Sequence, residues 1–314
     1  MFHSEWQNKN NPFTHPYHTM KNFFLFDWFA FLYRAYYAFP EMRNSEWQNI
    51  NAVYWFLRML LKRLNKKPEY IAIARDAQQK TFRHELAPDY KATRKKMDDD
   101  FKSQIPIIQD IVKELWIISR IAPWFEADDV IASFVNQYKS DSDLSMYIYS
   151  ADKDLKQLLT DWVFIVDPVK DLPYQKKDFL AEFWFEPQYI VDYLALLGDN
   201  ADNIKWVTWI GEKKAQSLIQ HYWTIENIYE HLNELEKAES SILGNQKDDA
   251  FFSKKMVQLA NVDLSGTKLE DFKYYFDWSK YIDIICDHNW IKWLEKPLTE
   301  MKKEFEKPQQ LGLF

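Results

Sequence analysis

The sequence predicts an α/β fold, in which a parallel sheet is flanked by helices and followed by a smaller helical subdomain. Short apolar runs alternate with longer amphipathic segments over the first half of the chain, which is typical of a parallel sheet with crossover helices. Asp27, Asp76 and Asp152 each lie at or next to the end of such a run. Because ligands bind at the carboxyl ends of parallel strands, these residues mark the expected site.

The expected strands are short and apolar, and they cover residues 23–26, 70–74, 144–149 and 163–166. The segments between them show helical periodicity, and we expect helices over residues 29–39, 51–65, 105–115 and 126–138. Residues 78–103 are polar, basic and poor in core-forming side chains. We therefore expect an exposed arch or lid there, with a local basic face.

The pattern changes to short helices from about residue 187. Residues 190–197 and 212–221 are expected to be helices on either side of a tight loop, a spacing that predicts a helix-hairpin-helix. The amides of such a hairpin can bind a phosphate or a coordinated cation without reading base sequence. The expected division of the chain is a disordered tail or misassigned start over 1–20, an α/β domain over 21–185, the helical subdomain over 186–294 and a charged tail over 295–314.

Composition narrows the class of protein. The 314 residues, of which 47% are hydrophobic, are enough for a sizeable core. A single cysteine, Cys286, excludes an internal disulfide framework and favours a reducing cytoplasm. The first twenty residues contain no apolar signal core. The aromatic run over 23–39 contains Asp27 and Arg34 and is too short to span a bilayer, so we expect a cytoplasmic protein without membrane segments.

Acidic clusters over 126–129, 152–154 and 199–203 carry most of the chemical information. Carboxylates brought within a few Å repel one another unless protons or cations neutralise them. Mg²⁺ prefers carboxylate and water oxygens, and two such ions can clamp the attacking and leaving oxygens of a phosphodiester. The clusters therefore predict metal-dependent phosphodiester hydrolysis. The net charge of −7 is compatible with such an enzyme, because neutralising the seven carboxylates of these clusters together with Asp27 and Asp76 leaves +2.

Tryptophan and glycine occur in an unusual ratio, 14 to 5, whereas glycine makes up about 7% of an ordinary domain. Many Trp residues stand where a turn or a close backbone approach favours Gly, which adopts positive φ without steric cost. Our hypothesis is that most of them are glycines in the living cell, through a codon that the source organism decodes as Gly. The alternative is a genuinely Trp-rich protein.

An ordered series of motifs resembles the 5′→3′ exonuclease domain of bacterial DNA polymerase I, part of the flap endonuclease superfamily. Over about residues 21–294 the motifs include Phe26-Asp27-Trp28, Thr81-Phe82-Arg83-His84-Glu85, Tyr90-Lys91-Ala92, Phe125-Glu126-Ala127-Asp128-Asp129-Val130, Ser150-Ala151-Asp152-Lys153-Asp154-Leu155, Gly198-Asp199 and Ile210-Gly211-Glu212-Lys213. No polymerase domain follows, so the chain resembles the stand-alone form. The resemblance implies a PIN-like parallel sheet, a helical arch over 78–103 and a C-terminal helix-hairpin-helix subdomain.

The resembled family carries Gly at seven positions that are Trp in this chain, which agrees with the decoding hypothesis. Trp209 lies in the hairpin that would approach DNA phosphates, where an indole should block contact. The seven positions are Trp28, Trp47, Trp55, Trp124, Trp206, Trp209 and Trp223.

The resemblance also implies a centre for two or more Mg²⁺ ions, for which Mn²⁺ can substitute. Asp128, Asp129 and Asp152 are the strongest candidates for direct ligands, and others would act through bound water. The implied metal site comprises nine carboxylates: Asp27, Asp76, Glu126, Asp128, Asp129, Asp152, Asp154, Asp199 and Asp202.

Basic and aromatic residues complete the implied site. Arg83 and Lys91 would be catalytic residues that hold the scissile phosphate and neutralise transition-state charge. Tyr33 would stack on a terminal base, although a core role is nearly as well supported. K⁺ is a further candidate ion at the helix-hairpin-helix, and other DNA contacts are implied for Arg94, Gly211, Lys213 and Lys214.

The C-terminal pentapeptide 310–314 resembles the sliding-clamp-binding motif of bacterial replication and repair proteins. A polar anchor followed by apolar residues suits an apolar pocket, whereas the alternative is a frayed tail. The implied contacts are Gln310, Leu311, Leu313 and Phe314.

The implied function is a structure-specific 5′→3′ exonuclease or 5′-flap endonuclease, acting as a monomer on DNA and RNA primers in replication and repair. One alternative is a non-catalytic paralogue that binds DNA junctions, which would be expected to lose cluster carboxylates. Another is a phosphatase or other metal hydrolase of small molecules, which the basic arch and the helix-hairpin-helix argue against.

Overall fold

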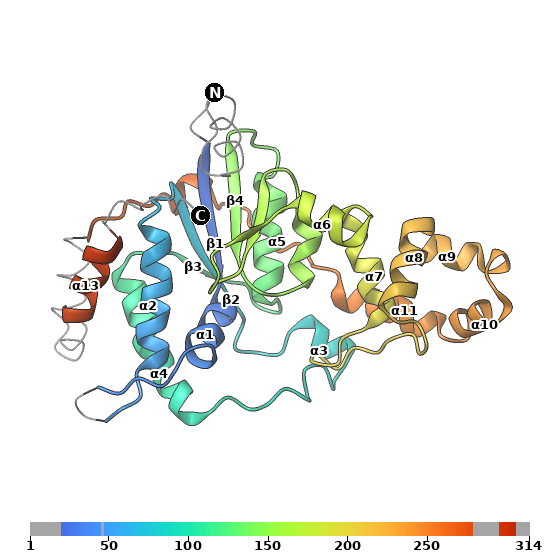
Figure 1. The fold of residues 1–314 in the computed structure, drawn as a ribbon, viewed down its shortest axis with the longest axis horizontal. Coiled ribbons are helices and arrows are strands. Elements are labelled where there is room, and N and C mark those ends of the chain that lie inside the picture. The colour runs from blue at the N-terminus through green and yellow to red at the C-terminus, as the bar shows by residue number, and fades with distance from the viewer. Residues whose placement is uncertain (1–19, 45–46, 279–294, 306–314) are drawn as a thin grey trace, which may run out of the picture.

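The computed structural model describes residues 20–44, 47–278 and 295–305, and its centre is a six-stranded sheet in the order β3-β2-β1-β4-β5-β6 (Figure 1). All neighbours are parallel except the pair β5 and β6. The expected parallel sheet is confirmed, and the two shortest strands are additions to it. The strands are β1 (Lys21–Asp27), β2 (Tyr70–Arg75), β3 (Ser119–Ile121), β4 (Leu144–Tyr149), β5 (Val163–Val166) and β6 (Pro173–Tyr174).

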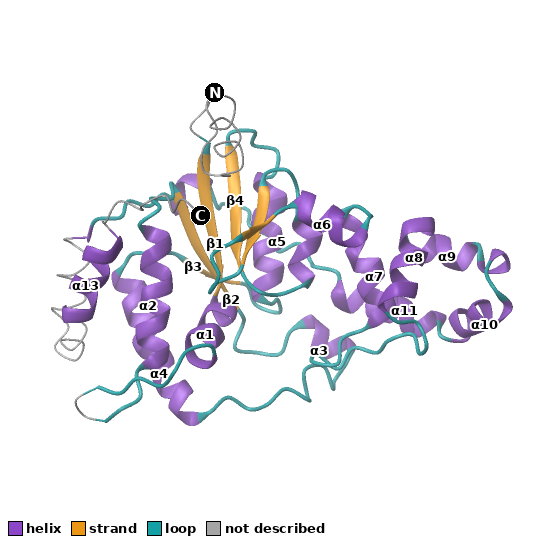
Figure 2. Ribbon diagram, in the orientation of Figure 1, coloured by secondary structure: helices purple, strands orange, loops and turns teal. Residues whose placement is uncertain are grey.

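Side chains alternate across β1, as the pleat of a strand requires. Phe23 and Leu25 enter one core cluster, while Phe24 and Phe26 enter the other on the opposite face. Figure 2 shows helices on both sides of the sheet. The second cluster takes in α1 (Trp28–Tyr37), α2 (Asn51–Leu64) and α4 (Asp99–Glu114), and the first takes in α5 (Ala127–Tyr138).

Helix α4 begins at Asp99, well before the expected start at residue 105, and Pro106 lies inside it. The Gln104 side-chain oxygen accepts hydrogen bonds from the amides of Ala52 (2.9 Å) and Val53 (3.3 Å). These are among the amides at the start of α2 that have no partner within the helix. The first turns of α4 are thus held by a tertiary contact that local periodicity does not reveal.

The expected arch runs as a long connection from β2 to α4, below α1 in Figure 1. It contains only the short helix α3 (Phe82–Leu86), so it is less helical than the resemblance implied. Lys91 has φ 58°, and its amide donates to the Asp202 carbonyl (3.0 Å). The arch is therefore tied to the helical subdomain, and one of its predicted functional residues holds a strained backbone conformation.

The second half of the chain forms a helical subdomain that extends away from the sheet (Figure 1). Gly198 follows α7 with φ 64°, and a Cβ there would lie 2.3 Å from the Lys205 carbonyl oxygen, so the turn requires glycine. The helices of the subdomain are α7 (Ile190–Leu197), α8 (Glu212–Tyr222), α9 (Ile225–Glu230), α10 (Lys237–Asn245) and α11 (Lys247–Val257), with 3₁₀ turns at Pro187–Tyr189, Leu232–Glu234 and Leu269–Phe272. The α/β domain also contains α6 (Lys176–Phe183) and a 3₁₀ turn at Asp154–Leu158, between β4 and β5.

The last described helix is α13 (Glu295–Phe305). It returns to the α/β domain, where Glu304 pairs with Arg58 of α2 (2.7 Å) and Leu298 and Met301 are buried in the core. Residues 1–19 of the N-terminal tail expected over 1–20 lie outside the described residues, and so does the pentapeptide 310–314. In the part of the chain that is described, no helix combines the length and apolarity that a bilayer span needs.

Backbone angles single out tryptophan. Ten described non-glycine residues have positive φ, and six of these are Trp with φ between 58° and 72°. Trp184 and Trp223 occupy the C-caps of α6 and α8, a position at which left-handed backbone usually selects Gly. The six are Trp47, Trp116, Trp124, Trp184, Trp209 and Trp223, of which four belong to the seven positions named from the sequence.

Candidate active site

A cavity of about 500 Å³ lies at the carboxyl ends of the central strands. Most of the residues singled out from the sequence line it, although they come from segments far apart in the chain. Asp129 and Asp199 are not among its lining residues, and neither are Gly211, Lys213 and Lys214. The residues that do line it are Asp27, Tyr33, Asp76, Arg83, Lys91, Arg94, Glu126, Asp128, Asp152, Asp154 and Asp202.

The ends of the strands fix the carboxylates at the floor of this cavity. Asp27 closes β1 and caps α1, accepting from the Ala30 amide (3.1 Å) and the Ser150 hydroxyl (2.8 Å). Asp76 follows β2 and accepts from the amide of Ala127 at the start of α5 (3.0 Å). The ends of β1 and β4 are thereby joined to each other, and the end of β2 is joined to the helix that carries the acidic cluster 126–129.

Five carboxylates in the cavity have raised pKa values. Burial, followed by the charge of Asp76, raises the pKa of Asp27 to about 7. Burial and the charges of Asp152 and Asp27 raise the pKa of Asp128 well above its ordinary value. Burial also raises the pKa of Asp76, Asp152 and Asp154. These groups stand close together without enough positive charge from the chain to offset their repulsion.

Two oxygen atoms decide whether the site fits a cation. Oδ1 of Asp128 and Oδ1 of Asp154 are buried and accept no hydrogen bond from any described residue. A buried carboxylate oxygen without a partner is costly, and a hard divalent cation is the ligand that oxygen donors of this kind prefer. The five residues fit such ions, although in the described residues no three acidic, His or Cys side chains already converge as a finished metal site.

The remaining four carboxylates are neutralised by the chain itself. Lys153 pairs with Asp199 (2.8 Å), and although burial opposes it, this hydrogen bond lowers the pKa of Asp199. Arg94 pairs with Asp202 (2.5 Å), and Lys91 pairs with Glu126 (2.5 Å). Asp129, which is fully buried, binds the guanidinium of Arg83.

Three neighbours of these carboxylates were not assigned roles from the sequence. The Tyr90 hydroxyl donates to Glu126 (3.1 Å) and Asp202 (3.2 Å), and burial beside their charges raises its pKa so that it remains a donor. Ser150 orients Asp27, and Lys153 neutralises Asp199. All three residues lie within the motifs quoted from the sequence, and Ser150 directly follows β4, so their positions alone were a usable signal.

The predicted duplex-binding residues lie on α8. Gly211 is its N-cap, and no described atom lies within 4 Å of where its Cβ would be, so the space beside it is open. Lys214 pairs with Glu239 (3.4 Å), and Lys213 lines a separate hollow beside Trp184. Trp209, in the loop before α8, is 81% exposed. Its ring therefore stands where it would obstruct a hairpin that approaches phosphates.

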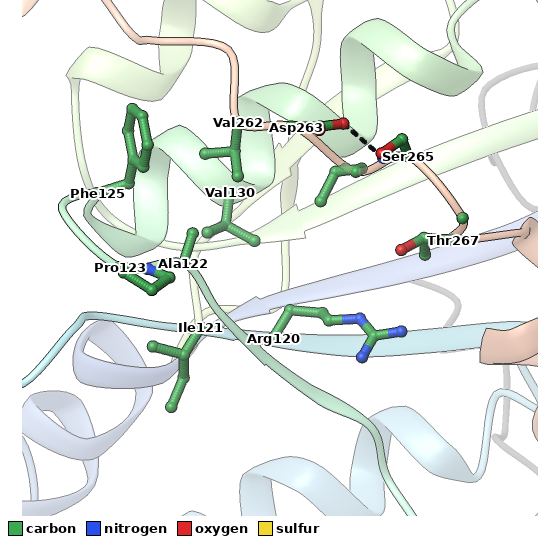
Figure 3. A pocket seen from close by; sticks show the side chains of 12 residues that line it. Arg120, Ile121, Ala122, Pro123, Phe125, Val130, Val262, Asp263, Ser265 and Thr267 are labelled. Carbon is green, nitrogen blue, oxygen red and sulfur yellow. Dashed lines mark hydrogen bonds between the residues drawn. The ribbon is translucent and has the colours of Figure 1, made fainter.

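Another hollow, of about 460 Å³, lies beside the edge strand β3 (Figure 3). Its lining is mainly apolar, and the ionisable residues in it are Arg120 and Asp263. The Asp263 carboxylate accepts a hydrogen bond from the Ser265 amide (2.8 Å), which the dashed line in Figure 3 marks. The Arg120 guanidinium lies over the Phe272 ring. Neither group offers the clustered carboxylates of the larger cavity, so we place the chemistry at the strand ends.

Family models match two consecutive parts of the chain. The model of the 5′-3′ exonuclease N-terminal resolvase-like domain matches residues 22–184, and that of the 5′-3′ exonuclease C-terminal SAM fold matches residues 185–276. The chain belongs to the 5′-3′ exonuclease family. As a member it is a nuclease that works from 5′ ends, and the resemblance drawn from its motifs is confirmed.

Individual relatives agree with this placement. A 5′-3′ exonuclease of Aquifex aeolicus is 38% identical over 256 residues, which are 81% of this chain and 87% of that protein. The DNA polymerase I of Caldicellulosiruptor bescii is 36% identical over 82% of this chain but only 31% of its own length. The solved structure of the bacteriophage T5 D15 flap endonuclease, in a complex with DNA and metal ions, aligns with TM-score 0.63 and 17% identity over 90% of this chain and 100% of that one. At 17% identity, the similarity to the T5 structure shows a shared fold and nothing more.

Proposed function

We propose that this 5′-3′ exonuclease cuts DNA at 5′ ends and 5′ flaps with divalent cations held at the strand ends. The observation that carries the proposal is the group of five buried or half-buried carboxylates whose pKa values are raised, in which Asp128 and Asp154 each keep a buried oxygen without a partner among the described residues. Cations bound there would lower the pKa of a water molecule and neutralise charge on the scissile phosphate. The T5 neighbour, which was solved with DNA and metal ions, supports this substrate and cofactor class.

The carboxylates divide into two roles in this proposal. Asp128, Asp152 and Asp154, with Asp27 and Asp76, hold two or more Mg²⁺ ions, and Mn²⁺ substitutes for them. Basic side chains already occupy the other four members of the predicted set. Glu126, Asp199 and Asp202 act from the rim through water, and Asp129 is bound to Arg83.

The arch supplies positive charge for the phosphate. Lys91 and Arg94 line the same cavity as the raised-pKa carboxylates, and each is bound there to a carboxylate. A phosphate oxygen entering the cavity would offer them an alternative anionic partner. Tyr33 also lines the cavity, and it is 39% exposed with its ring stacked near Tyr37, which leaves a ring available for a terminal base.

Duplex DNA would bind along α8 in the same proposal. The open amides near Gly211, together with Lys213 and Lys214, would contact the phosphate backbone, with K⁺ as a further ion at the hairpin. The shape of the junction, rather than base identity, would then select the substrate. RNA primers, a monomeric state and a cytoplasmic location complete the proposal on the strength of the family resemblance.

The deciding experiment is Mg²⁺-dependent cleavage of a 5′-flap duplex by four proteins. These are the chain as written, a version with Gly at the seven positions where the family has Gly, and Asp154→Asn in each. We expect cleavage that requires Mg²⁺ and that falls at least about tenfold in Asp154→Asn, because losing even an indirect metal contact costs about 10–100-fold. If both parent proteins fold but neither cuts, the non-catalytic junction-binding alternative replaces this proposal.

A clamp contact through the C-terminal pentapeptide is tested separately. Deleting residues 310–314 should leave cleavage of a free oligonucleotide duplex unchanged, since none of the cavity residues is removed. Binding to the bacterial sliding clamp, measured by surface plasmon resonance, should weaken in the same variant. Unchanged clamp affinity would remove this partner from the proposal.

A further inference from the structure

Arg83 has no donor left for a phosphate. Its side chain is 2% exposed. Nε donates to the Met256 carbonyl (2.8 Å), and Nη1 donates to Asp129 (2.7 Å) and Glu126 (3.1 Å). Nη2 donates to Asp129 (2.9 Å) and to the Gln258 carbonyl (3.2 Å). A guanidinium has five N–H groups, so five acceptors from the chain account for all of them.

Asp129 is saturated in the same way. Oδ1 accepts from Arg83 (2.9 Å) and the Ala260 amide (2.9 Å), and Oδ2 accepts from Arg83 (2.7 Å) and the Glu126 amide (3.0 Å). A carboxylate has about four lone-pair sites. Asp129 therefore has none left for a cation, whereas Asp128 beside it keeps a buried oxygen with no partner.

The partners of this pair belong to a segment that returns from the helical subdomain. Residues 256–262, here called the returning segment, begin in the last turn of α11 and hydrogen-bond to α5 through the Ala260 and Val262 amides. Gln157 accepts from the Leu259 amide (3.2 Å), and the Ser133 hydroxyl accepts from the Val262 amide (2.6 Å). Leu259 lines the carboxylate cavity. The returning segment is thus fastened through its backbone to the base of the arch and to α5.

We propose that Arg83 and Asp129 are positioning residues, which set the helical subdomain at a fixed distance from the carboxylate cavity. The pair fastens the returning segment to α3 and α5, and α11 of the subdomain runs directly into that segment. The inference rests on the proposed function for the identity of the substrate. It replaces the catalytic and metal-ligand roles that the sequence suggested for these two residues.

The consequence is measurable in where the enzyme cuts. A duplex held on the helical subdomain presents one phosphodiester to the cavity only if the two regions keep their spacing. Loosening the pair lets neighbouring phosphodiesters enter, and a misplacement of about 1 Å costs roughly a hundredfold in rate. Losing a cation ligand instead lowers the rate and the Mg²⁺ affinity but leaves the alignment, and hence the position of the cut, as it was.

The test compares Arg83→Lys and Asp129→Asn with the matched control Asp128→Asn, the next residue along α5. Single-turnover cleavage of an end-labelled 5′-flap duplex gives rate and cut position, and calorimetric titration gives Mg²⁺ affinity. We expect the first two variants to keep Mg²⁺ affinity within about threefold, to slow roughly a hundredfold and to spread their cuts over adjacent positions. Loss of Mg²⁺ affinity in Asp129→Asn, or slower cutting at a single unchanged position in Arg83→Lys, would overturn the proposal.

A second readout needs no cleavage, so it separates this inference from the proposed function. Hydrogen–deuterium exchange at the amides of Leu259, Ala260 and Val262 should quicken in Arg83→Lys and Asp129→Asn and stay unchanged in Asp128→Asn. Ser133→Ala, which removes a single hydroxyl contact to the returning segment, serves if the charged variants do not fold. Unchanged exchange at Val262 together with unchanged cut positions in Ser133→Ala would count against the proposal.

A separate observation, on backbone angles, carries a second inference. The six Trp residues with positive φ are between 47% and 81% exposed. A bulky side chain in left-handed backbone is a steric outlier, and these rings regain little by packing. We infer that all six are glycine in the protein that its own cells make. The inference adds Trp116 and Trp184, which the sequence motifs did not name.

Peptide mass spectrometry of the protein purified from its native cells tests this directly. Peptides covering Trp116 and Trp184 should carry the mass of glycine at those positions, and intact tryptophan there would overturn the inference. A recombinant version with Gly at all six should melt roughly 5–10 °C above the chain as written, because six strained residues are relieved. An equal or lower melting temperature would also count against it.

Discussion

Asp128 and Asp129 are neighbours in the first turn of α5, yet they belong to opposite electrostatic regions. Adjacent residues on a helix point about 100° apart. Asp128 faces Asp27, Asp76 and Asp152, and its pKa is raised well above the ordinary value. Asp129 faces Arg83 and has every oxygen satisfied. A carboxylate in an acidic cluster is thus available to a cation only where the chain has not already supplied the countercharge.

The largest expected effect is on the folding stability of variants at Asp128 and Asp129, measured without metal. Asp128→Asn removes a repelling charge, so the free energy of unfolding should rise. Asp129→Asn leaves Arg83 buried with a weaker partner, so the free energy of unfolding should fall, by about 3 kcal/mol or more. Urea denaturation of both variants in EDTA measures the two changes. Shifts of the same sign would break the contrast between the regions.

The pH dependence of the metal-free protein is the next largest effect. The folded pKa of Asp27 is about 7, above its ordinary value of 3.8, so between these values the folded state binds more protons than the unfolded state. Stability must then fall as pH rises through this range. Urea midpoints in EDTA should be lower at pH 8 than at pH 5.5. Saturating Mg²⁺ should flatten the slope, and Asp27→Asn, as a control, should reduce it in EDTA; a midpoint that rises towards pH 8 would contradict the account.

The smallest expected effect concerns the ion pair between Lys153 and Asp199. Lys153 is about half exposed where it pairs with Asp199, and such exposed ion pairs contribute about 0–1 kcal/mol. Lys153→Met should therefore change the urea midpoint little. It should raise Mg²⁺ affinity by less than about tenfold, because a cation near the cavity is removed, as calorimetric titration can measure. A fall in Mg²⁺ affinity would indicate that Lys153 supports the cavity instead of neutralising its rim.

Segments with a strong local pattern were predicted closely. The strands 144–149 and 163–166 and the helix 190–197 match the structure because each is a bounded apolar run. The start of α4 was missed because the contact of Gln104 with α2 comes from a segment about fifty residues away. The pocket itself followed from aspartates at strand ends, which all meet at one edge of a parallel sheet.

The sequence alone could not predict which carboxylates of the acidic clusters are available to a cation and which are paired with basic side chains of the chain. Arg83 lies 46 residues from Asp129, and the carbonyls it also binds belong to the returning segment still further along the chain. Arg83 and Lys91 look alike as basic residues of the arch, and both line the cavity, but Arg83 is 2% exposed whereas the Lys91 side chain is 22% exposed. Only the folded arrangement distinguishes the cation that is already committed from the cation that remains exchangeable.

Gly198 is a position at which this chain does not tolerate a translation error. Its Cβ position lies 2.3 Å from a backbone oxygen, so no ribosomal error that inserts a larger residue there can be absorbed. The six left-handed tryptophan positions are at least 47% exposed and leave room for a ring. A cell whose tRNAs misread a glycine codon as tryptophan would therefore lose this protein through position 198 long before it lost it through the surface turns.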